Sequence, residues 1–161
     1  MCNEILATKY KNSAILRRRI LSAVNAITQI TVVDSNKIAA IGYCFGGVCA
    51  IELARSGSDI LGVISVHGIL SPAIGLSNKK ITTKVLCLHG FDDPMVPLEQ
   101  VQAFQTEMTD SSVDWQLHSY GNTMHAFSNP NANNLGAGVQ FNALADHRAS
   151  QTIKSFLEEL F

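Results

Sequence analysis

The chain turns sharply at residues 41–47, Ile41-Gly42-Tyr43-Cys44-Phe45-Gly46-Gly47, where an apolar run typical of a β-strand gives way to a run typical of an α-helix. A cysteine stands at the centre of this turn, with one glycine two positions before it and another two positions after it. This spacing predicts a nucleophile elbow, which holds its central residue in a strained backbone conformation. A side chain at Gly42 or Gly46 is expected to collide with the neighbouring strand or helix. The elbow would hold the Cys44 thiol at the mouth of a site.

Cys44 would also lie at the N-terminus of the following helix. The unpaired N–H groups there and the helix dipole favour negative charge, and so favour the thiolate, which is the nucleophilic form of cysteine. A Gly-x-Cys-x-Gly pattern also arises in α/β proteins that have a tight strand-to-helix turn and a buried cysteine. On this motif alone, the catalytic and the structural interpretations of Cys44 both stay open.

Two more polar segments follow apolar runs that are typical of strands. Asp92 and Asp93 come after the run at residues 85–88, and His125 comes after the alternating run at residues 115–120. A nucleophile, an acid and a histidine therefore occur in the chain order of α/β-hydrolases. Each lies just past the carboxyl end of a predicted strand, which is where ligands bind in parallel sheets. The three segments together favour the catalytic interpretation.

Residues from about 38 to the C-terminus resemble the dienelactone hydrolase family of α/β-hydrolases. The segments that carry the resemblance are Gly42-Tyr43-Cys44-Phe45-Gly46-Gly47, His89-Gly90-Phe91-Asp92-Asp93-Pro94-Met95-Val96-Pro97 and Met124-His125-Ala126-Phe127. The resemblance implies a Cys-His-Asp triad with Cys44 as nucleophile, His125 as base and Asp93 as the residue that orients the histidine. Asp92 is the alternative acid. The family acid stands four residues before the proline of a Val-Pro pair, here Pro97, and this position favours Asp93.

The resemblance also implies a reaction. It predicts a hydrolase that acts on a carboxylic ester or lactone bond through an acyl-enzyme, so the expected partner is a small ester or lactone molecule. The backbone N–H of Phe45 would donate one hydrogen bond to the oxyanion. In this fold a second donor comes from a loop that follows an earlier strand, and that strand is not found in this chain.

Three residues beside the expected site are candidates for contact with the substrate. Tyr43 is expected to pack beneath the nucleophile, with a hydroxyl able to reach the pocket. His67 and His89 follow predicted strands and are able to contact substrate, although hydrogen bonds to loop backbone are the favoured alternative for both. The family branch that acts on dienelactone has an arginine shortly after the catalytic histidine, whereas residues 126–129 contain no cation. This difference argues against dienelactone itself as the substrate.

Strand-like and helix-like segments alternate along the chain, as expected for a parallel sheet with helices on both faces. We therefore expect an α/β protein, a three-layer α/β/α sandwich with a mainly parallel sheet, which is a partial α/β-hydrolase fold. Residues 128–138 are rich in Asn and Gly and are expected to form a loop. The predicted strands are residues 38–41, 60–66, 84–89 and 113–120, and the predicted helices are residues 13–27, 46–55, 98–108 and 142–160.

The part of the chain before the elbow is short for this family. Most of it is one predicted helix, so we expect a single domain over residues 1–161 that is N-terminally truncated relative to the family. The strand at residues 38–41 would then lie at the edge of the sheet, with unpaired N–H and C=O groups that promote association. We expect a homodimer, or another association, through this exposed sheet edge.

Composition argues against several classes of function. The 161 residues carry 12 Lys and Arg against 13 Asp and Glu, and this balance argues against nucleic-acid binding. The triplet at residues 17–19 is assigned to a solvated helix face, and Glu52 and Glu107 are interpreted as ordinary helix charges. No apolar run approaches the ~20 residues that span a membrane, and no signal peptide is found, so a cytoplasmic location is expected.

Cysteine usage fits the same location. Cys2, Cys44, Cys49 and Cys87 would be free thiols in the cytoplasm, and their spacing is not that of a metal site. No cofactor is expected either. The alternative to an enzyme is a non-catalytic hydrolase remnant, or a half-domain that needs a partner chain. The missing loop favours this alternative, because loss of one oxyanion donor alone costs ~10²–10³ in turnover.

Overall fold

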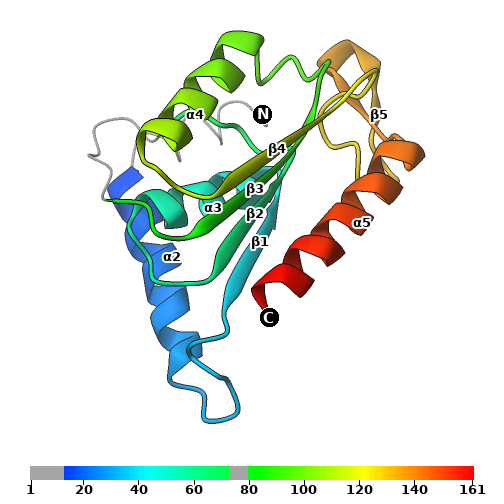
Figure 1. The fold of residues 1–161 in the computed structure, drawn as a ribbon. Coiled ribbons are helices and arrows are strands. Elements are labelled where there is room, and N and C mark those ends of the chain that lie inside the picture. The colour runs from blue at the N-terminus through cyan, green and yellow to red at the C-terminus, as the bar shows by residue number, and fades with distance from the viewer. Residues whose placement is uncertain (1–12, 73–79) are drawn as a thin grey trace.

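The computed structural model describes residues 13–72 and 80–161, which form a four-stranded sheet flanked by helices and a separate two-stranded sheet (Figure 1). The predicted alternation of strands and helices is confirmed. In chain order the elements are α2 (Ser13–Thr28), β1 (Ala39–Tyr43), α3 (Phe45–Arg55), β2 (Gly62–Val66), β3 (Lys84–Gly90), α4 (Leu98–Asp110), β4 (Trp115–Tyr120), β5 (Asn133–Asn134), the 3-10 helix η1 (Leu135–Ala137), β6 (Val139–Gln140) and α5 (Ala143–Leu160).

The larger sheet is parallel throughout, in the order β1-β2-β3-β4. Its central strands β2 and β3 are almost completely buried, which explains why they are nearly continuous apolar runs in the sequence. The register places Tyr43 beside Val66 and Val66 beside Leu88. The carboxyl ends of neighbouring strands therefore finish at the same edge of the sheet, and the loops that follow them meet there.

Two hydrophobic cores lie on opposite faces of this sheet. Helices α2, α3 and α4 cover one face and α5 covers the other (Figure 1). Neighbouring residues of a strand point to opposite faces, so β2 contributes Val63 to the core with Ile51 and Phe104, and Ile64 to the core with Phe156. The expected three-layer α/β/α sandwich is confirmed.

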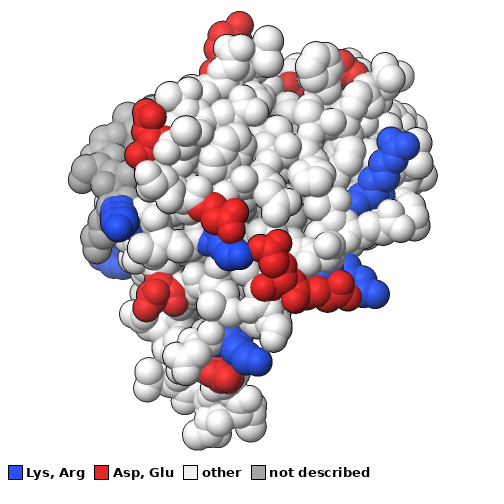
Figure 2. Space-filling model, in the orientation of Figure 1, with Lys and Arg blue, Asp and Glu red and all other residues white. Residues whose placement is uncertain are grey.

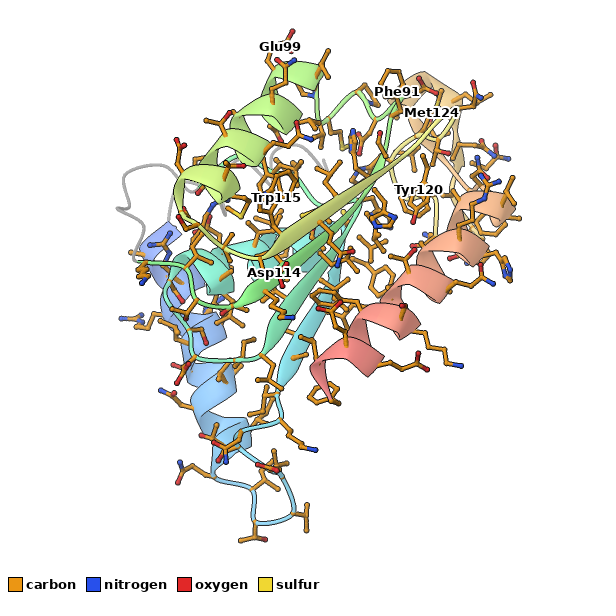
Figure 3. The ribbon with its side chains drawn as sticks, viewed as in Figure 1. Phe91, Glu99, Asp114, Trp115, Tyr120 and Met124 are labelled. Carbon is orange, nitrogen blue, oxygen red and sulfur yellow. The ribbon has the colours of Figure 1, made fainter. Side chains whose placement is uncertain are left out.

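Strand β4 shows the same alternation at one edge of the sheet (Figure 3). Trp115 lies on the α4 side, with its ring centroid 6.4 Å from that of Phe104. Tyr120 lies on the α5 side, with its ring centroid 5.5 Å from that of Phe127. The aromatic side chains of β4 therefore close both cores where the sheet ends.

The predicted loop at residues 128–138 contains regular structure, and in this respect the prediction was wrong. Strands β5 and β6 pair antiparallel, with η1 between them. The Asn134 side chain accepts a hydrogen bond from the Ala137 N–H at 3.1 Å, and Gly138 has a left-handed φ of 68°. The Asn and Gly content that suggested a loop thus forms a tight turn between two very short strands.

A buried group of charged side chains joins three helices, and it corrects two of the assignments made above. Arg55 is 1% exposed and forms ion pairs with Glu52 and Glu107, as well as hydrogen bonds to two loop carbonyls. Arg17 of α2 contacts Glu52 at 2.9 Å. Arg17 is therefore not on a solvated face, and Glu52 and Glu107 are not ordinary surface charges. The other two arginines of the triplet are exposed, as predicted.

Strand β1 lies at the other edge of the sheet and pairs only with β2 among the described residues. The side chains of Ile41 and Tyr43 are about half exposed. An edge strand with exposed apolar side chains favours association. Association through this edge stays a prediction.

Charges of both signs are intermixed on the face shown in Figure 2, in keeping with the net charge of −1. Within the part of the chain that the structure describes, no helix has the length and apolar character needed to cross a membrane. Cys44, Cys49 and Cys87 are free thiols, and Cys2 lies outside the described residues.

Candidate active site

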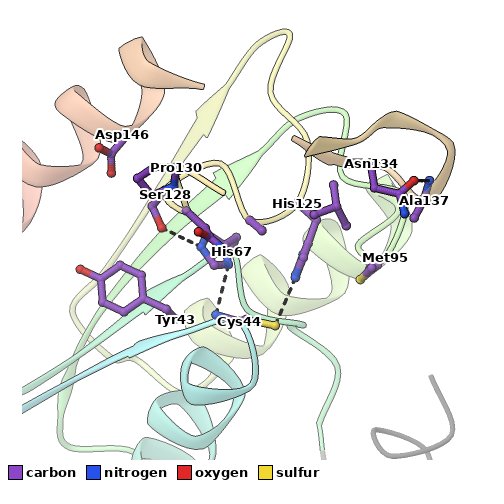
Figure 4. A pocket seen from close by; sticks show the side chains of 13 residues that line it. Tyr43, Cys44, His67, Met95, His125, Ser128, Pro130, Asn134, Ala137 and Asp146 are labelled. Atoms are coloured by element: carbon purple, nitrogen blue, oxygen red, sulfur yellow. Dashed lines mark hydrogen bonds between the residues drawn. The ribbon is translucent and has the colours of Figure 1, made fainter. Parts of the chain in front are cut away.

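The loops at the carboxyl ends of the strands surround a pocket of about 950 Å³ (Figure 4). Cys44 follows β1, His67 follows β2, and His125 belongs to the segment after β4. The side chains come together because the parallel register brings these strand ends to one edge. The pocket is lined by Tyr43, Cys44, His67, Met95, His125, Ala126, Ser128, Asn129, Pro130, Asn134, Ala137, Val139 and Asp146.

The turn at Cys44 has the strained geometry expected of an elbow. Cys44 has φ 53° and ψ −116°, a backbone conformation that non-glycine residues rarely adopt. A Cβ atom on Gly42 would lie 1.9 Å from the Gly46 carbonyl oxygen, so the predicted collision at Gly42 is confirmed. The prediction for Gly46 was wrong, because a Cβ there would meet no described atom within 4 Å. Gly47 is the second constrained glycine, since its Cβ would lie 2.9 Å from the Gly68 Cα.

His125 lies between Asp93 and Cys44. Its Nε2 atom is 3.3 Å from the Cys44 Sγ atom (Figure 4), and its Nδ1 atom is 2.8 Å from Asp93 Oδ2. Asp93 is 3% exposed, and its Oδ1 atom accepts a hydrogen bond from the Met95 N–H at 2.8 Å. Asp92 is exposed. The structure therefore brings Asp93, and not the alternative Asp92, against the histidine.

The small hairpin formed by β5, η1 and β6, residues 133–140, holds the backbone of His125. The His125 N–H donates to the Gly138 carbonyl at 3.0 Å, and the His125 carbonyl accepts from the Gln140 N–H at 3.1 Å. The next residue, Ala126, has a left-handed φ of 57°. The segment that the sequence presented as a loop therefore positions the histidine through two backbone hydrogen bonds.

The contact between His125 and Cys44 changes the pKa of both groups. The hydrogen bond from His125 lowers the pKa of Cys44 from its ordinary value of 9.0, and this effect outweighs the opposing effect of burial. Burial favours the neutral form of His125, but hydrogen bonds to Asp93 and Cys44 outweigh burial and raise its pKa to about 9. The two shifts act in the direction of a thiolate beside an imidazolium.

Phe45 is the first residue of α3, so its backbone N–H lies at the helix N-terminus and has no carbonyl partner within the helix. This N–H forms a hydrogen bond that lowers the pKa of Cys44. A narrow cavity beside it is lined by Phe45, Cys44 and His125. The N–H therefore faces the sulfur beside this cavity.

The candidates for substrate contact differ in where they lie. Tyr43 does not pack beneath the nucleophile but is 49% exposed and lines the pocket, because it lies on the edge strand. His67 also lines the pocket, and both of its ring nitrogens form hydrogen bonds within the protein. His89 does not line it, and its Nδ1 atom is buried without a partner among the described residues.

Several residues that line the pocket were not predicted from the sequence. Ser128 follows His125 by three positions, and Asp146 lies in the first turn of α5 (Figure 4). The hairpin contributes Asn134. Of these three residues, Ser128 could have been predicted from the sequence, because it lies close to the histidine motif. Among the described residues, no three His, Cys, Asp or Glu side chains are grouped as a metal site requires.

The chain is similar to several known proteins. The sequence profile of the dienelactone hydrolase family matches residues 3–161. The chain belongs to the dienelactone hydrolase family. It is 34% identical to an uncharacterized protein of Caenorhabditis elegans over 91% of this chain and 94% of that protein. Membership of this family supports a hydrolase.

Other relatives are longer than this chain. It is 26% identical to the carboxymethylenebutenolidase homolog of Mus musculus, over 74% of this chain and 47% of that protein. The solved structure of P91, a dienelactone hydrolase-like promiscuous phosphotriesterase from metagenomic libraries, superposes with a TM-score of 0.91 at 36% identity. That superposition covers 99% of this chain and 67% of P91. The chain thus spans about half of the mouse relative and two thirds of P91.

Proposed function

We propose that this chain hydrolyses a carboxylic ester or lactone through a Cys44-His125-Asp93 triad and an acyl-enzyme. The observation that carries the proposal is the contact of 3.3 Å between His125 Nε2 and Cys44 Sγ in the lining of the pocket. A nucleophile, a base beside it and a carboxylate that orients the base are the parts that covalent acyl transfer requires. Membership of the dienelactone hydrolase family supports the same class of reaction.

Acylation uses the ion pair that the pKa shifts favour. The Cys44 thiolate attacks the carbonyl carbon, a C–S bond forms, and the carbonyl oxygen becomes an oxyanion that accepts a hydrogen bond from the Phe45 N–H. When this intermediate collapses, the C–O bond to the leaving group breaks. The His125 imidazolium gives its Nε2 proton to the leaving oxygen, so the alcohol departs and a thioester stays on Cys44.

Deacylation reverses the roles of the same groups. Neutral His125 takes a proton from water at Nε2, and the water oxygen attacks the thioester carbon. The C–S bond then breaks, which releases the carboxylic acid and restores the thiolate beside the imidazolium. Asp93 accepts a hydrogen bond from the Nδ1–H of His125 throughout, which keeps Nε2 turned toward the sulfur.

The lining residues favour a substrate without a carboxylate. Outside the triad, Asp146 is the charged residue that lines the pocket. None of the described Lys or Arg residues lines the pocket. A carboxylate on the substrate would be repelled by Asp146 and would lose water without gaining a cationic partner outside the triad. The absence of a cation at residues 126–129 points the same way. We therefore assign uncharged esters or lactones as the substrate class.

A second candidate substrate class is the uncharged phosphotriester. P91, at 36% identity, is a promiscuous phosphotriesterase by name. Phosphotriesters carry no net charge, unlike phosphate monoesters and diesters, so they suit a lining without Lys or Arg. Release of para-nitrophenol from paraoxon by the wild-type chain, and not by Cys44→Ala, would support this class. Equal release by the two proteins would contradict it.

The competing proposal is a non-catalytic chain, or a half-domain that needs a partner chain for its activity. Turnover of para-nitrophenyl acetate by the purified chain, compared with Cys44→Ala, decides between them. We expect saturable turnover that falls to the background rate in the variant. A wild-type rate equal to that of the variant would contradict the proposed hydrolase.

A further inference from the structure

His67 occupies a strained position directly after β2. Its backbone φ is 42°, in the left-handed region that favours glycine, and the residue is 3% exposed. Its ring lies edge-on to two others, with centroid distances of 5.2 Å to His125 and 5.3 Å to Phe127. Such strain persists only where surrounding contacts over-determine the conformation. The contacts of the His67 ring therefore hold the residue in this conformation.

One ring nitrogen of His67 accepts a hydrogen bond from the nucleophile's backbone. The Cys44 N–H lies 3.1 Å from His67 Nδ1, and the same N–H is shared with the Val66 carbonyl at 3.0 Å. An Nδ1 atom that accepts carries no proton, so the neutral ring carries its proton on Nε2. Burial and the charge of nearby His125 lower the pKa of His67 to about 4, which keeps the ring neutral.

The other ring nitrogen of His67 forms a hydrogen bond with Ser128. His67 Nε2 lies 2.8 Å from Ser128 Oγ and, because it carries the proton, donates to that oxygen (Figure 4). A serine oxygen that accepts from His67 still has its own proton to donate. The part of the chain that the structure describes offers no acceptor for this proton, and Ser128 lines the pocket. The hydroxyl is therefore available to a bound molecule.

We propose that His67 is a positioning residue that links the nucleophile to the substrate-binding wall of the pocket. Its Nδ1 atom holds the Cys44 backbone, and its Nε2–H holds Ser128 so that the serine hydroxyl donates to an uncharged oxygen of the substrate. This assigns Ser128 as a substrate-binding residue and makes His67 its support. The inference rests on the proposed function because it takes Cys44 as the nucleophile.

Three variants separate the two hydrogen bonds. Ser128→Ala removes the hydroxyl alone. His67→Asn keeps an acceptor near the position of Nδ1 and a residue that tolerates a left-handed backbone, but it is too short to reach Ser128. His67→Phe keeps an aromatic ring against Phe127 and removes both nitrogens. Urea unfolding of each variant identifies any that fails to fold.

The kinetic test compares kcat and KM for a para-nitrophenyl ester that has an ether oxygen in its acyl chain. It also compares the rate at which iodoacetamide alkylates Cys44, measured on the Cys44 peptide by mass spectrometry. Ser128→Ala and His67→Asn should raise KM by about twofold to tenfold, the effect of one neutral hydrogen bond, with alkylation near the wild-type rate. His67→Phe should also lower kcat and the alkylation rate, by roughly tenfold. Wild-type KM in Ser128→Ala, or wild-type alkylation in a folded His67→Phe, would overturn the proposal.

A second measurement does not depend on ester turnover. A long-range proton–nitrogen NMR spectrum of isotope-labelled protein, with the His67 signals assigned by their loss in His67→Phe, should show a neutral ring protonated at Nε2 at neutral pH. A ring protonated at Nδ1, or at both nitrogens, would overturn the inference. A chain that shows the expected ring state but no Cys44-dependent turnover would instead contradict the proposed function.

Discussion

His125 Nε2 lies 3.3 Å from Cys44 Sγ although 81 positions separate the two residues in the chain. Cys44 is held by the turn between β1 and α3, whereas His125 is held by the hairpin that follows β4. Strands β2 and β3 lie between β1 and β4 in the sheet. The contact therefore depends on the register of all four strands, and it reports whether the whole sheet is assembled.

The two neighbouring aspartates differ in exposure and so give a matched pair of variants. Asp93→Asn removes the carboxylate that fixes the ring of His125, and we expect it to lower kcat by roughly 10²–10⁴. Asp92→Asn changes an exposed side chain and should keep the wild-type rate. Steady-state kinetics on an aryl ester checks both. Equal losses in the two variants would contradict the assignment of Asp93.

The reactivity of Cys44 should depend on pH in a direction that its hydrogen bond sets. Because His125 lowers the pKa of the thiol below 9.0, the thiolate persists at pH values where an ordinary cysteine is protonated. Alkylation of Cys44 by iodoacetamide should therefore reach half of its maximal rate below pH 9.0. His125→Gln removes the contact and should move this midpoint upward. An unchanged midpoint in the variant would show that the histidine does not act on the thiol.

Two glycines of the elbow should respond differently to a methyl group. Gly42→Ala places a Cβ against the Gly46 carbonyl oxygen, and we expect it to lower the free energy of unfolding by about 1–3 kcal/mol or more. Gly46→Ala fills open space in a helix, where alanine is favoured over glycine, so the same quantity should stay the same or rise. Urea unfolding measures both changes. A more stable Gly42→Ala would contradict the described elbow.

Substrate charge should control the rate through Asp146. We expect kcat/KM for para-nitrophenyl butyrate to exceed that for the para-nitrophenyl hemisuccinate, which has a carboxylate at the chain end, by roughly tenfold. Asp146→Asn should bring this ratio of kcat/KM values closer to one. The measurement is the ratio of the two kcat/KM values in each protein. A wild-type preference for the hemisuccinate would refute an uncharged substrate class.

The strands and the outline of the site were predictable because they depend on local patterns. Buried parallel strands are continuous apolar runs, and the elbow is a contiguous motif around Cys44. Since parallel strands place their carboxyl ends at one edge, residues after three different strands were expected to converge. The choice between Asp92 and Asp93 needed the resemblance to a family, because both occupy the same turn.

Contacts between distant segments were not predictable. Arg55 lies in a helix and has the sequence context of a surface residue, while its partner Glu107 is 52 positions away. Strands β5 and β6 have two residues each, too few for an alternating pattern. The link from His67 to Ser128 spans 61 positions and depends on a ring orientation that no motif encodes.

The central claim is a covalent acyl-enzyme on Cys44. The most direct measurement mixes the purified chain with para-nitrophenyl acetate, quenches the reaction in acid within its first turnovers, and locates the added acetyl group by peptide mass spectrometry. The account predicts an acetyl group on Cys44, lost in Cys44→Ala and longer-lived in His125→Gln. Turnover without any acyl group on Cys44, or an acetyl group on Cys49 alone, would contradict it.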